Sequence, residues 1–232
     1  MIIPAYNEEA NIGMLLDRVE AIITERTLPL SIIVIDDGSA DSTRSIAENK
    51  AREYENIDVV VHEKNKGFAA ALKTGIASAL AAGYDAAIFM DCDQTHDPAD
   101  LPMFIQEFKK GIDVVIGSRY VGTGGMVDVP WYRIAISKIG NGFGKLVFRL
   151  PVRDASSGYR GLNRKAMESI KIEVNDFGIQ VEEVLRARNL KLSFSEIPIV
   201  LVNRKLGTSK FNLTFVALWR YFVLLIRSLS WR

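Results

Sequence analysis

The sequence predicts a single α/β domain built on a mostly parallel sheet with helices on both faces. Short apolar runs of strand type alternate along the chain with longer segments of helical pattern, which is typical of βαβ units. The 232 residues are 48% hydrophobic and 25% charged, which suits one compact domain with an ordinary core. Two of the apolar runs end in aspartate pairs, at the edge where open α/β sheets bind ligands.

The elements follow in order from this alternation. We expect residues 1–4 to form the last part of a first strand. We expect a helix at residues 8–25, capped by Asn7 or a neighbour. Later strands are expected at 31–35, 57–61, 86–90, 113–117 and 194–202. Later helices are expected at 41–54, 68–83, 99–110, 131–149, 163–170 and 178–188. The Gly-rich segment 117–130 has no clear period, and we expect a mobile loop there that serves as a lid.

The aspartate pairs indicate the ligand edge. Asp36-Asp37 follows the run 31–35, and Asp91-Cys92-Asp93 follows the run 86–90. Residues two apart on an extended segment project to the same face, so Asp91 and Asp93 can approach a single cation. Cys92 then points the other way, into the core. Acidic side chains gathered at strand ends predict a polar ligand or a metal.

The charge of the chain is unevenly distributed. Its net charge is only +1, yet Glu196 is its last acidic residue. The basic residues that follow it are Arg204, Lys205, Lys210, Arg220, Arg227 and Arg232. This asymmetry predicts an anionic partner near the C-terminus, and the usual candidates are nucleic acid and a membrane surface. The apolar neighbourhood favours the membrane, and we expect no nucleic-acid partner.

The segment 211–232 is nearly apolar and helical in composition. Arg220 and Arg227 are seven residues apart and share one face, which makes a thin polar stripe. Because crossing a bilayer takes roughly 20 apolar residues, we expect an interfacial helix here, attached to a catalytic domain at 1–210. The aromatic residues suited to anchor it are Trp219, Tyr221 and Trp231. A helix packed in the core or at a dimer interface, and a tail leading into membrane segments, are the alternatives.

The single cysteine excludes an internal disulfide framework. No N-terminal signal peptide is visible, so the expected location is cytoplasmic. Together with the interfacial helix, this predicts a peripheral protein on the cytoplasmic face of a membrane.

Seven short motifs follow one another along nearly the whole chain. They are Pro4-Ala-Tyr-Asn-Glu8, Asp36-Asp-Gly-Ser39, Asn65-Lys-Gly67, Asp91-Cys-Asp-Gln-Thr-His-Asp-Pro98, Gly117-Ser-Arg-Tyr120, Arg153-Asp-Ala-Ser-Ser-Gly-Tyr-Arg160 and Arg204-Lys-Leu-Gly-Thr-Ser-Lys210. Because these motifs occur together and in this order, the chain resembles the family 2 glycosyltransferases of the GT-A, Rossmann-like fold. Within them it resembles the dolichyl-phosphate mannosyltransferase and polyprenyl-phosphate glycosyltransferase group.

The resemblance implies a nucleoside pocket in the first third of the chain. Its residues would be Pro4, Tyr6, Glu8, Ile35 and Asp37. Carboxylates there accept hydrogen bonds from ribose hydroxyls or a base edge. Capping and turn formation are the structural alternative, and this suits Asn7 and Ser39 better than Asp37. Residues 65–67 would start a helix near the nucleotide, and a direct contact from Lys66 is left open.

The resemblance also implies that Asp91 and Asp93 hold Mg²⁺ or Mn²⁺, with Asp93 the more direct ligand and Cys92 between them in the nucleotide-sugar site. Carboxylates and phosphate oxygens suit such hard divalent cations. A helix N-cap is the structural alternative for Asp93. His96 is either a third ligand or a structural hydrogen-bonding residue. Thr95 stands where some relatives carry glutamine, so its part in metal binding is left open.

The implied catalytic residues surround two anionic substrates. They are Asp93, Arg119, Arg133, Ser137 and Arg204, of which Arg119 and Arg204 also serve the donor together with Lys210. Guanidinium groups bind phosphate in bidentate fashion and would offset the repulsion between the substrates. A lipid phosphate is already an anionic nucleophile, so alignment and charge screening would matter most. A solvated surface residue is the alternative for any lone arginine.

Three further residues match family positions near the sugar and the acceptor. Asp154 would orient an arginine or contact the sugar. Gln180 has no assigned role, and Glu182 is expected to be a partner for Arg204.

The expected function is an inverting, metal-dependent transfer of a hexose to dolichyl or polyprenyl phosphate. GDP-mannose is the leading donor, with UDP-glucose or a UDP-N-acetylhexosamine as the alternative, and the need for a membrane partner subunit is left open. A catalytically silent membrane-attached scaffold is a different reading. A signalling receiver domain matches only residues 32–37 and is much shorter than this chain. A sugar-nucleotide synthesising enzyme is disfavoured because its Gly-rich phosphate loop is missing.

Overall fold

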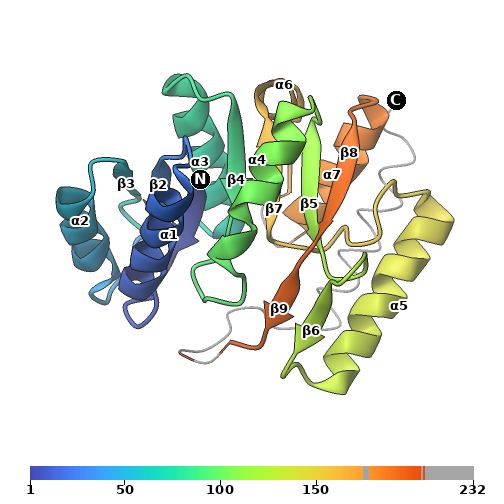
Figure 1. The fold of residues 1–232 in the computed structure, drawn as a ribbon, viewed down its shortest axis with the longest axis horizontal. Coiled ribbons are helices and arrows are strands. Elements are labelled where there is room, and N and C mark those ends of the chain that lie inside the picture. Colours follow the sequence, from blue (N-terminus) through green and yellow to red (C-terminus); the bar gives the residue numbers. More distant parts are fainter. Residues whose placement is uncertain (175–177, 205, 207–232) are drawn as a thin grey trace.

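The computed structural model describes residues 1–174, 178–204 and 206. A seven-stranded sheet in the order β3-β2-β1-β4-β7-β5-β8 forms its centre (Figure 1). The strands of this sheet are β1 (Ile2–Ala5), β2 (Ile32–Asp36), β3 (Ile57–Val61), β4 (Ala86–Phe89), β5 (Val114–Ser118), β7 (Arg160–Asn163) and β8 (Phe194–Pro198). Only β7 runs antiparallel to its neighbours. The mostly parallel α/β architecture predicted from the sequence is therefore confirmed.

Helices cover both faces of this sheet. They are α1 (Ile12–Arg26), α2 (Thr43–Glu53), α3 (Phe68–Ala81), α4 (Leu101–Lys109), α5 (Trp131–Phe148), α6 (Arg164–Ser169) and α7 (Ile179–Asn189), with a short 3-10 helix η1 (Pro98–Asp100) before α4. One core cluster joins the sheet to α3, α6 and α7, and the other joins it to α1 and α4. Successive residues of a strand supply opposite faces, so Ile33 enters the first cluster and Val34 the second.

The strand β2 is buried along its whole length, as expected of a parallel strand covered on both faces. The helix α3 lies very close to the sheet at Gly75. A Cβ atom at Gly75 would lie 2.4 Å from the Cγ2 atom of Ile2, so only glycine fits between α3 and β1. This tight packing fixes α3 against the start of β1, the strand that leads into the first motif.

The antiparallel strand β7 positions the later motifs. Its first residue, Arg160, pairs with Phe89 of β4 on one side and with Ile116 of β5 on the other. The segment 154–159 just before β7 therefore reaches the carboxyl ends of β4 and β5. The sequence did not predict this strand, because Arg160-Gly-Leu-Asn163 is short and carries no strand-type alternation.

Three predictions about boundaries were wrong. The helix α1 begins at Ile12 rather than at residue 8, and Asn7 lies outside it in the left-handed region at φ 51°. The side-chain oxygen of Asn7 accepts the backbone N–H of Ala40 at 2.8 Å, so Asn7 braces the second motif instead of capping α1. The predicted strand 194–202 is divided into β8 and a separate short strand, Val200–Val202.

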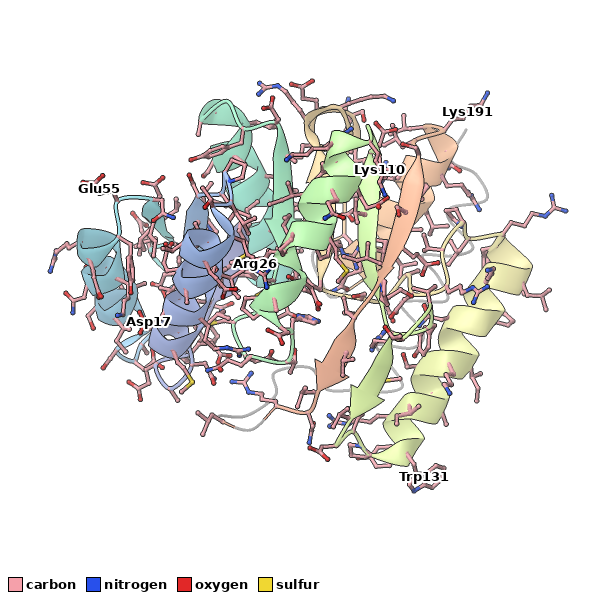
Figure 2. The ribbon with its side chains drawn as sticks, in the orientation of Figure 1. Asp17, Arg26, Glu55, Lys110, Trp131 and Lys191 are labelled. Carbon is pink, nitrogen blue, oxygen red and sulfur yellow. The ribbon has the colours of Figure 1, made fainter. Side chains whose placement is uncertain are left out.

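The strand β9 (Val200–Val202) belongs to a second, two-stranded sheet with β6 (Gly125–Val127). The strand β6 lies inside the segment 117–130, which we had expected to be a loop throughout. Figure 1 shows this small sheet beyond the ends of β5 and β8, with α5 along the same edge of the molecule. Figure 2 shows Trp131 at one end of α5, pointing away from the body of the protein. No helix in the described ranges is long and apolar enough to span a membrane.

Candidate active site

Asp37 lies immediately after β2 and is almost fully buried, with 3% of its surface exposed. One carboxylate oxygen lies 2.6 Å from the Nδ1 atom of His62 and accepts the backbone N–H of Lys66 at 2.9 Å. The other oxygen accepts the backbone N–H of Gly67 at 2.8 Å. The Nε2 atom of His62 lies 2.9 Å from the hydroxyl oxygen of Thr74. Asp37 therefore joins the β2 end to the start of α3, and Lys66 contributes through its backbone.

The turn after Asp37 depends on Gly38. Its φ of +70° lies in the region that favours glycine, and a Cβ atom there would lie 2.5 Å from the carbonyl carbon of Lys64. The chain at Lys64 thus packs directly on the turn. This contact holds the chain at 64–65 against the end of β2.

Glu8 and Arg204 join the two ends of the described chain. The Oε2 atom of Glu8 accepts hydrogen bonds from the side chain of Asn11 at 2.8 Å and from the Nη2 atom of Arg204 at 2.6 Å. The Nη1 atom of Arg204 lies 3.8 Å from the Oδ2 atom of Asp93. Glu8 and Asp93, two of the predicted site residues, are therefore bridged by a third.

Asp91 follows β4, and its carboxylate lies against Gly158 of the loop before β7. A Cβ atom at Gly158 would lie 2.6 Å from the Oδ2 atom of Asp91, so glycine is required for this approach. Burial, and after it the charge of Asp93, raise the pKa of Asp91 to about 7, while the buried Arg160 acts in the opposite direction. The carboxylate pair is thus electrostatically strained without a cation between its members.

The side chain of Asp93 is 23% exposed. Its Oδ1 atom accepts hydrogen bonds from the backbone N–H of Thr95 at 3.2 Å and from the hydroxyl of Thr95 at 2.8 Å. The Oδ2 atom faces Arg204 and remains available to a ligand. Thr95 therefore orients the carboxylate of Asp93, which is the role that its place in the motif left open.

His96 is buried, with 3% of its surface exposed, and its ring lies 5.0 Å from the ring of Tyr159. Neither ring nitrogen has a hydrogen-bond partner among the described residues. The structural hydrogen bond considered for His96 is therefore absent from that part of the chain. Burial lowers the pKa of His96 to about 4, so the ring is neutral at physiological pH.

The residues at the end of β4 fit a divalent cation. Two carboxylates, two residues apart, supply hard oxygen donors. The pKa of Asp91 is raised by burial and then by the charge of Asp93, and a bound cation would offset both. Within residues 1–174, 178–204 and 206, no three His, Cys, Asp or Glu side chains are placed to hold an ion together. A cation bound by Asp91 and Asp93 would therefore complete its ligands with oxygens from elsewhere.

Arg119 follows β5 and is held by Asp154. The Nε and Nη2 atoms of Arg119 donate to the two carboxylate oxygens of Asp154 at 2.7 and 2.6 Å, and Nη2 also donates to Ser156 at 2.9 Å. Asp154 is fully buried. Such a bidentate pair fixes the plane of the guanidinium group. Of the two roles considered for Asp154, the structure supports the orientation of an arginine.

The helix α5 carries both Ser137 and Arg133. The hydroxyl of Tyr120 donates to the Oγ atom of Ser137 at 2.7 Å, which ties α5 to the β5 end. Arg133 is exposed in the first turn of α5. A pocket of about 440 Å³ lies between these elements, lined by Arg119, Tyr120, Gly122, Gly124, Gly125, Met126, Ile134 and Lys138. Neither Ser137 nor Arg133 lines this pocket.

The remaining predicted residues lie as follows. Pro4 pairs in register with Ile35, whose side chain is fully buried, so a ligand can reach Ile35 only through its backbone. Tyr6 is half-buried next to them. Cys92 is buried in the core cluster with α1 and α4, as its alternation with the aspartates predicted. Lys210 and the segment 211–232 lie outside the described residues.

The prediction that Glu182 is a partner of Arg204 was wrong. Glu182 is fully buried and accepts the Nε–H of Arg186 at 2.7 Å and the backbone N–H groups of residues 173 and 174. It therefore holds the segment before α7. Gln180 contributes its backbone oxygen, which accepts a hydrogen bond from Arg160 at 2.8 Å.

Sequence reasoning missed His62 and Tyr120 as parts of this site. His62 lies 25 residues from Asp37 in sequence, and the only available signal was its position just after the strand 57–61. Tyr120 belongs to a quoted motif, but its partner Ser137 could be identified only from the packing of α5.

Comparisons with known proteins agree with one another. The model of the family described as Glycosyl transferase family 2 matches residues 1–171. Polyprenol monophosphomannose synthase of Mycolicibacterium smegmatis is 33% identical over 216 residues, which cover 91% of this chain and 80% of that protein. Undecaprenyl-phosphate mannosyltransferase of Micrococcus luteus is 33% identical over 214 residues, covering 91% and 86%. Dolichol-phosphate mannosyltransferase of Pyrococcus furiosus is 32% identical, covering 90% and 58%.

Similar solved structures include glucosyl-3-phosphoglycerate synthase from Mycobacterium tuberculosis. Its complex with phosphoglyceric acid has a TM-score of 0.71 at 19% identity, covering 98% of this chain and 78% of that one. Its complex with Mn²⁺, UDP and glucosyl-3-phosphoglycerate has a TM-score of 0.69 at 20% identity, covering 98% and 77%. At this identity the likeness shows the shared fold, in which a divalent metal and a nucleotide have been bound together.

Proposed function

The chain belongs to glycosyl transferase family 2 and is a glycosyltransferase, and on that premise we propose that it transfers mannose from GDP-mannose to a polyprenyl phosphate. The observation that carries this proposal is the loop before β7. Its residue Gly158 lies against Asp91, and its residue Asp154 holds Arg119. Groups suited to a nucleoside diphosphate and to a phosphate acceptor thus share one sheet edge.

On the donor side, the residues around β1 and β2 would form the nucleoside pocket. Asp37 shapes this pocket through its bonds to the chain at 66–67, and a carboxylate accepts further hydrogen bonds from ribose hydroxyls. Mg²⁺ or Mn²⁺ held by Asp91 and Asp93 would neutralise charge on the departing nucleoside diphosphate. Arg204, anchored on Glu8, would contact the same phosphates and the acceptor.

On the acceptor side, Arg119 would bind the lipid phosphate through the part of its guanidinium edge that Asp154 does not use. A phosphate oxygen of the acceptor attacks C1 of the sugar as the bond between C1 and the diphosphate oxygen breaks, which inverts the configuration at C1. The nucleophile is anionic, so the proposed step needs no proton transfer and depends on holding two anions in line. Arg133 and Ser137 would help to hold the acceptor.

The donor is proposed as GDP-mannose because three similar proteins are named for mannose transfer. UDP-glucose or a UDP-N-acetylhexosamine is the alternative. Residues 211–232 are proposed to bind the membrane that carries the acceptor, with residues 1–210 as the catalytic domain on its cytoplasmic face. A membrane partner subunit is compatible with this arrangement.

The test is a transfer assay with purified protein, a polyprenyl phosphate, Mg²⁺ or Mn²⁺, and labelled GDP- and UDP-sugars. The expected result is metal-dependent transfer of labelled mannose into the organic phase from GDP-mannose. If only a UDP-sugar supported transfer, the proposed donor would be wrong and the proposed reaction class would stand. Absence of any product together with absence of nucleotide binding would favour the silent scaffold.

A further inference from the structure

The exposed face of α5 is apolar along the whole helix. The residues that form it are Tyr132, Ile136, Ile139, Phe143 and Leu146, spaced four, three, four and three residues apart and therefore in one stripe. Ile139 is 70% exposed and Leu146 is 82% exposed. Trp131, 79% exposed, extends this apolar face at the first turn of the helix (Figure 2). A stripe of this length on the outside of a protein marks a binding surface.

The charged residues of the segment 129–153, which contains this stripe, are all basic. Between Asp128 and Asp154 the chain has no acidic residue. The basic residues in this interval are Arg133, Lys138, Lys145, Arg149 and Arg153. A helix with an apolar face, cationic flanks and aromatic residues at one end is the pattern of a helix lying in an anionic membrane interface.

A second pocket lies on the cationic flank of α5. It has a volume of about 310 Å³ and is lined by Tyr120, Lys138, Asn141, Gly142, Lys145 and Arg153. Among the ion pairs of the described residues, none involves the side chains of Lys138, Lys145 or Arg153. The carboxylate of Glu196 accepts the backbone N–H of Arg153 at 2.9 Å, so one acidic group lies close to this residue. Three cationic side chains around one pocket still outnumber it and can bind a phosphate group.

This pocket is separate from the one that Arg119 lines. Tyr120 and Lys138 are common to both, but Lys145 and Arg153 line only the second pocket, and Arg119 lines only the first. Asn141 forms the wall next to the Arg119 site, because its side-chain amide donates to Ser156 at 3.0 Å. The second pocket thus opens beside the apolar stripe and not on the reacting groups.

We propose that the pocket formed by Lys138, Lys145 and Arg153 binds the phosphate of an anionic phospholipid headgroup, apart from the acceptor phosphate, when the apolar stripe of α5 lies in the membrane interface beside it. This rests on the proposed function insofar as the acceptor is carried by a membrane. The apolar stripe enters the acyl boundary while the headgroup phosphate fills the pocket beside it. The headgroup then sets the height and rotation of Arg119 relative to the lipid surface.

The first test compares two charge reversals at the end of α5. Lys145→Glu changes a residue that lines the pocket, and Arg149→Glu makes the same charge change four residues on, outside the pocket. Binding of the full chain to phosphatidylglycerol and phosphatidylcholine vesicles is measured by sedimentation. We expect Lys145→Glu to weaken binding to phosphatidylglycerol about 30-fold and Arg149→Glu no more than about fivefold. Equal losses would mean diffuse attraction and would overturn the pocket.

The second test addresses the apolar stripe. Ile139→Glu with Leu146→Glu places two charges at exposed positions, so the fold should keep its melting temperature. We expect this double variant to bind vesicles of both compositions more weakly than the wild type, by more than Lys145→Glu does on phosphatidylcholine, while residues 211–232 retain part of the binding. Unchanged binding would mean that another part of the chain or a second copy covers α5, and would overturn the interfacial position.

The third test separates this site from the acceptor site and from the proposed function. In detergent micelles, Lys145→Glu is expected to transfer sugar with unchanged kcat and unchanged KM for the polyprenyl phosphate. A raised KM would assign the pocket to the acceptor and overturn the proposal. If the wild-type protein transferred no sugar while the vesicle differences persisted, the proposed function alone would fail.

Discussion

The ends of β2 and β4 both carry an aspartate, but the two carboxylates differ in how many hydrogen-bond partners the protein gives them. Asp37, after β2, accepts two backbone hydrogen bonds and lies against His62, so its two oxygens have three protein partners. Asp91, after β4, has no hydrogen-bond partner in the described ranges, and its pKa is raised to about 7 by burial and by Asp93. One carboxylate belongs to the framework, and the other is incomplete without a ligand.

This difference divides the site into two parts. We call the residues that build its framework, such as Asp37, the wall, and the residues that need a ligand, such as Asp91 and Asp93, the centre. Removing a satisfied buried carboxylate leaves its donors unpaired, which costs stability. Removing a strained carboxylate relieves repulsion, so its loss should reduce function and leave the apo fold intact. Each comparison below therefore measures stability and activity separately.

The largest expected effect is that of Asp93→Ala on transfer. Its carboxylate faces Arg204 and is oriented by Thr95, so we expect a loss of about 4 kcal/mol of transition-state stabilisation, roughly 10³-fold in kcat/KM. Asp58→Ala, at an exposed position of β3, is the matched control and should retain activity. Retained activity in Asp93→Ala would remove the metal assignment from the β4 end.

The next largest effect is on stability, and it tests the difference between Asp37 and Asp91. Asp37→Asn should lower the free energy of unfolding by about 2 to 3 kcal/mol, because it disturbs the contacts with His62, Lys66 and Gly67. Asp91→Asn should leave that free energy unchanged or raise it, because the charged carboxylate is costly in the apo fold. Denaturant unfolding of both variants without metal provides the measurement. A similar loss in the two variants would break the distinction between wall and centre.

Much of the fold could be predicted from the sequence because the central parallel strands β2, β4 and β5 are mainly apolar runs. β2 is buried along its length and stands out as Ile32-Ile-Val-Ile35. β7 could not be found in this way, since Arg160 and Asn163 give no apolar run and its pairing with β4 and β5 is a property of the assembled sheet. β6 was hidden for the same reason in a Gly-rich segment.

The same distinction, between local patterns and contacts made only in the folded protein, applies to the candidate site. Asp91 and Asp93 were identified because their spacing is local, and the orientation of Arg119 by Asp154 was one of two roles considered. The contact between Asp37 and His62 depends on the parallel pairing of β2 with β3, which no local pattern encodes. The exposed stripe of α5 was also missed, because a helical period does not reveal which apolar face is left uncovered.

A smaller effect on ligand binding is expected at Gly158, which lies against Asp91 but has no functional group of its own. In Gly158→Ala the new Cβ would lie 2.6 Å from the Oδ2 atom of Asp91, so that carboxylate must turn away. We expect metal-dependent nucleotide affinity to fall about 10- to 100-fold, as for residues that support metal ligands. Calorimetric titration with and without Mn²⁺ measures this loss. Gly142→Ala, where a Cβ meets no neighbour within 4 Å, should bind normally.

The smallest effect is the pH dependence of the apo protein. The pKa of Asp91 is raised from 3.8 to about 7, so the folded state holds its proton more tightly than the unfolded chain does. Stability should therefore rise as the pH falls through that window, by about 1 kcal/mol between pH 7 and pH 6 from this residue. Asp91→Asn removes the titrating group, and the difference between the two proteins isolates its contribution from that of other groups.

Metal binding should show the opposite dependence on pH. A cation and a proton compete for Asp91, so metal-dependent nucleotide affinity should weaken as the pH falls below about 7 while the apo fold gains stability. Such opposed slopes require one carboxylate that is costly when charged and useful only when a cation is bound. If both slopes had the same sign, Asp91 would be a framework residue like Asp37, and the centre would reduce to Asp93 and Arg204.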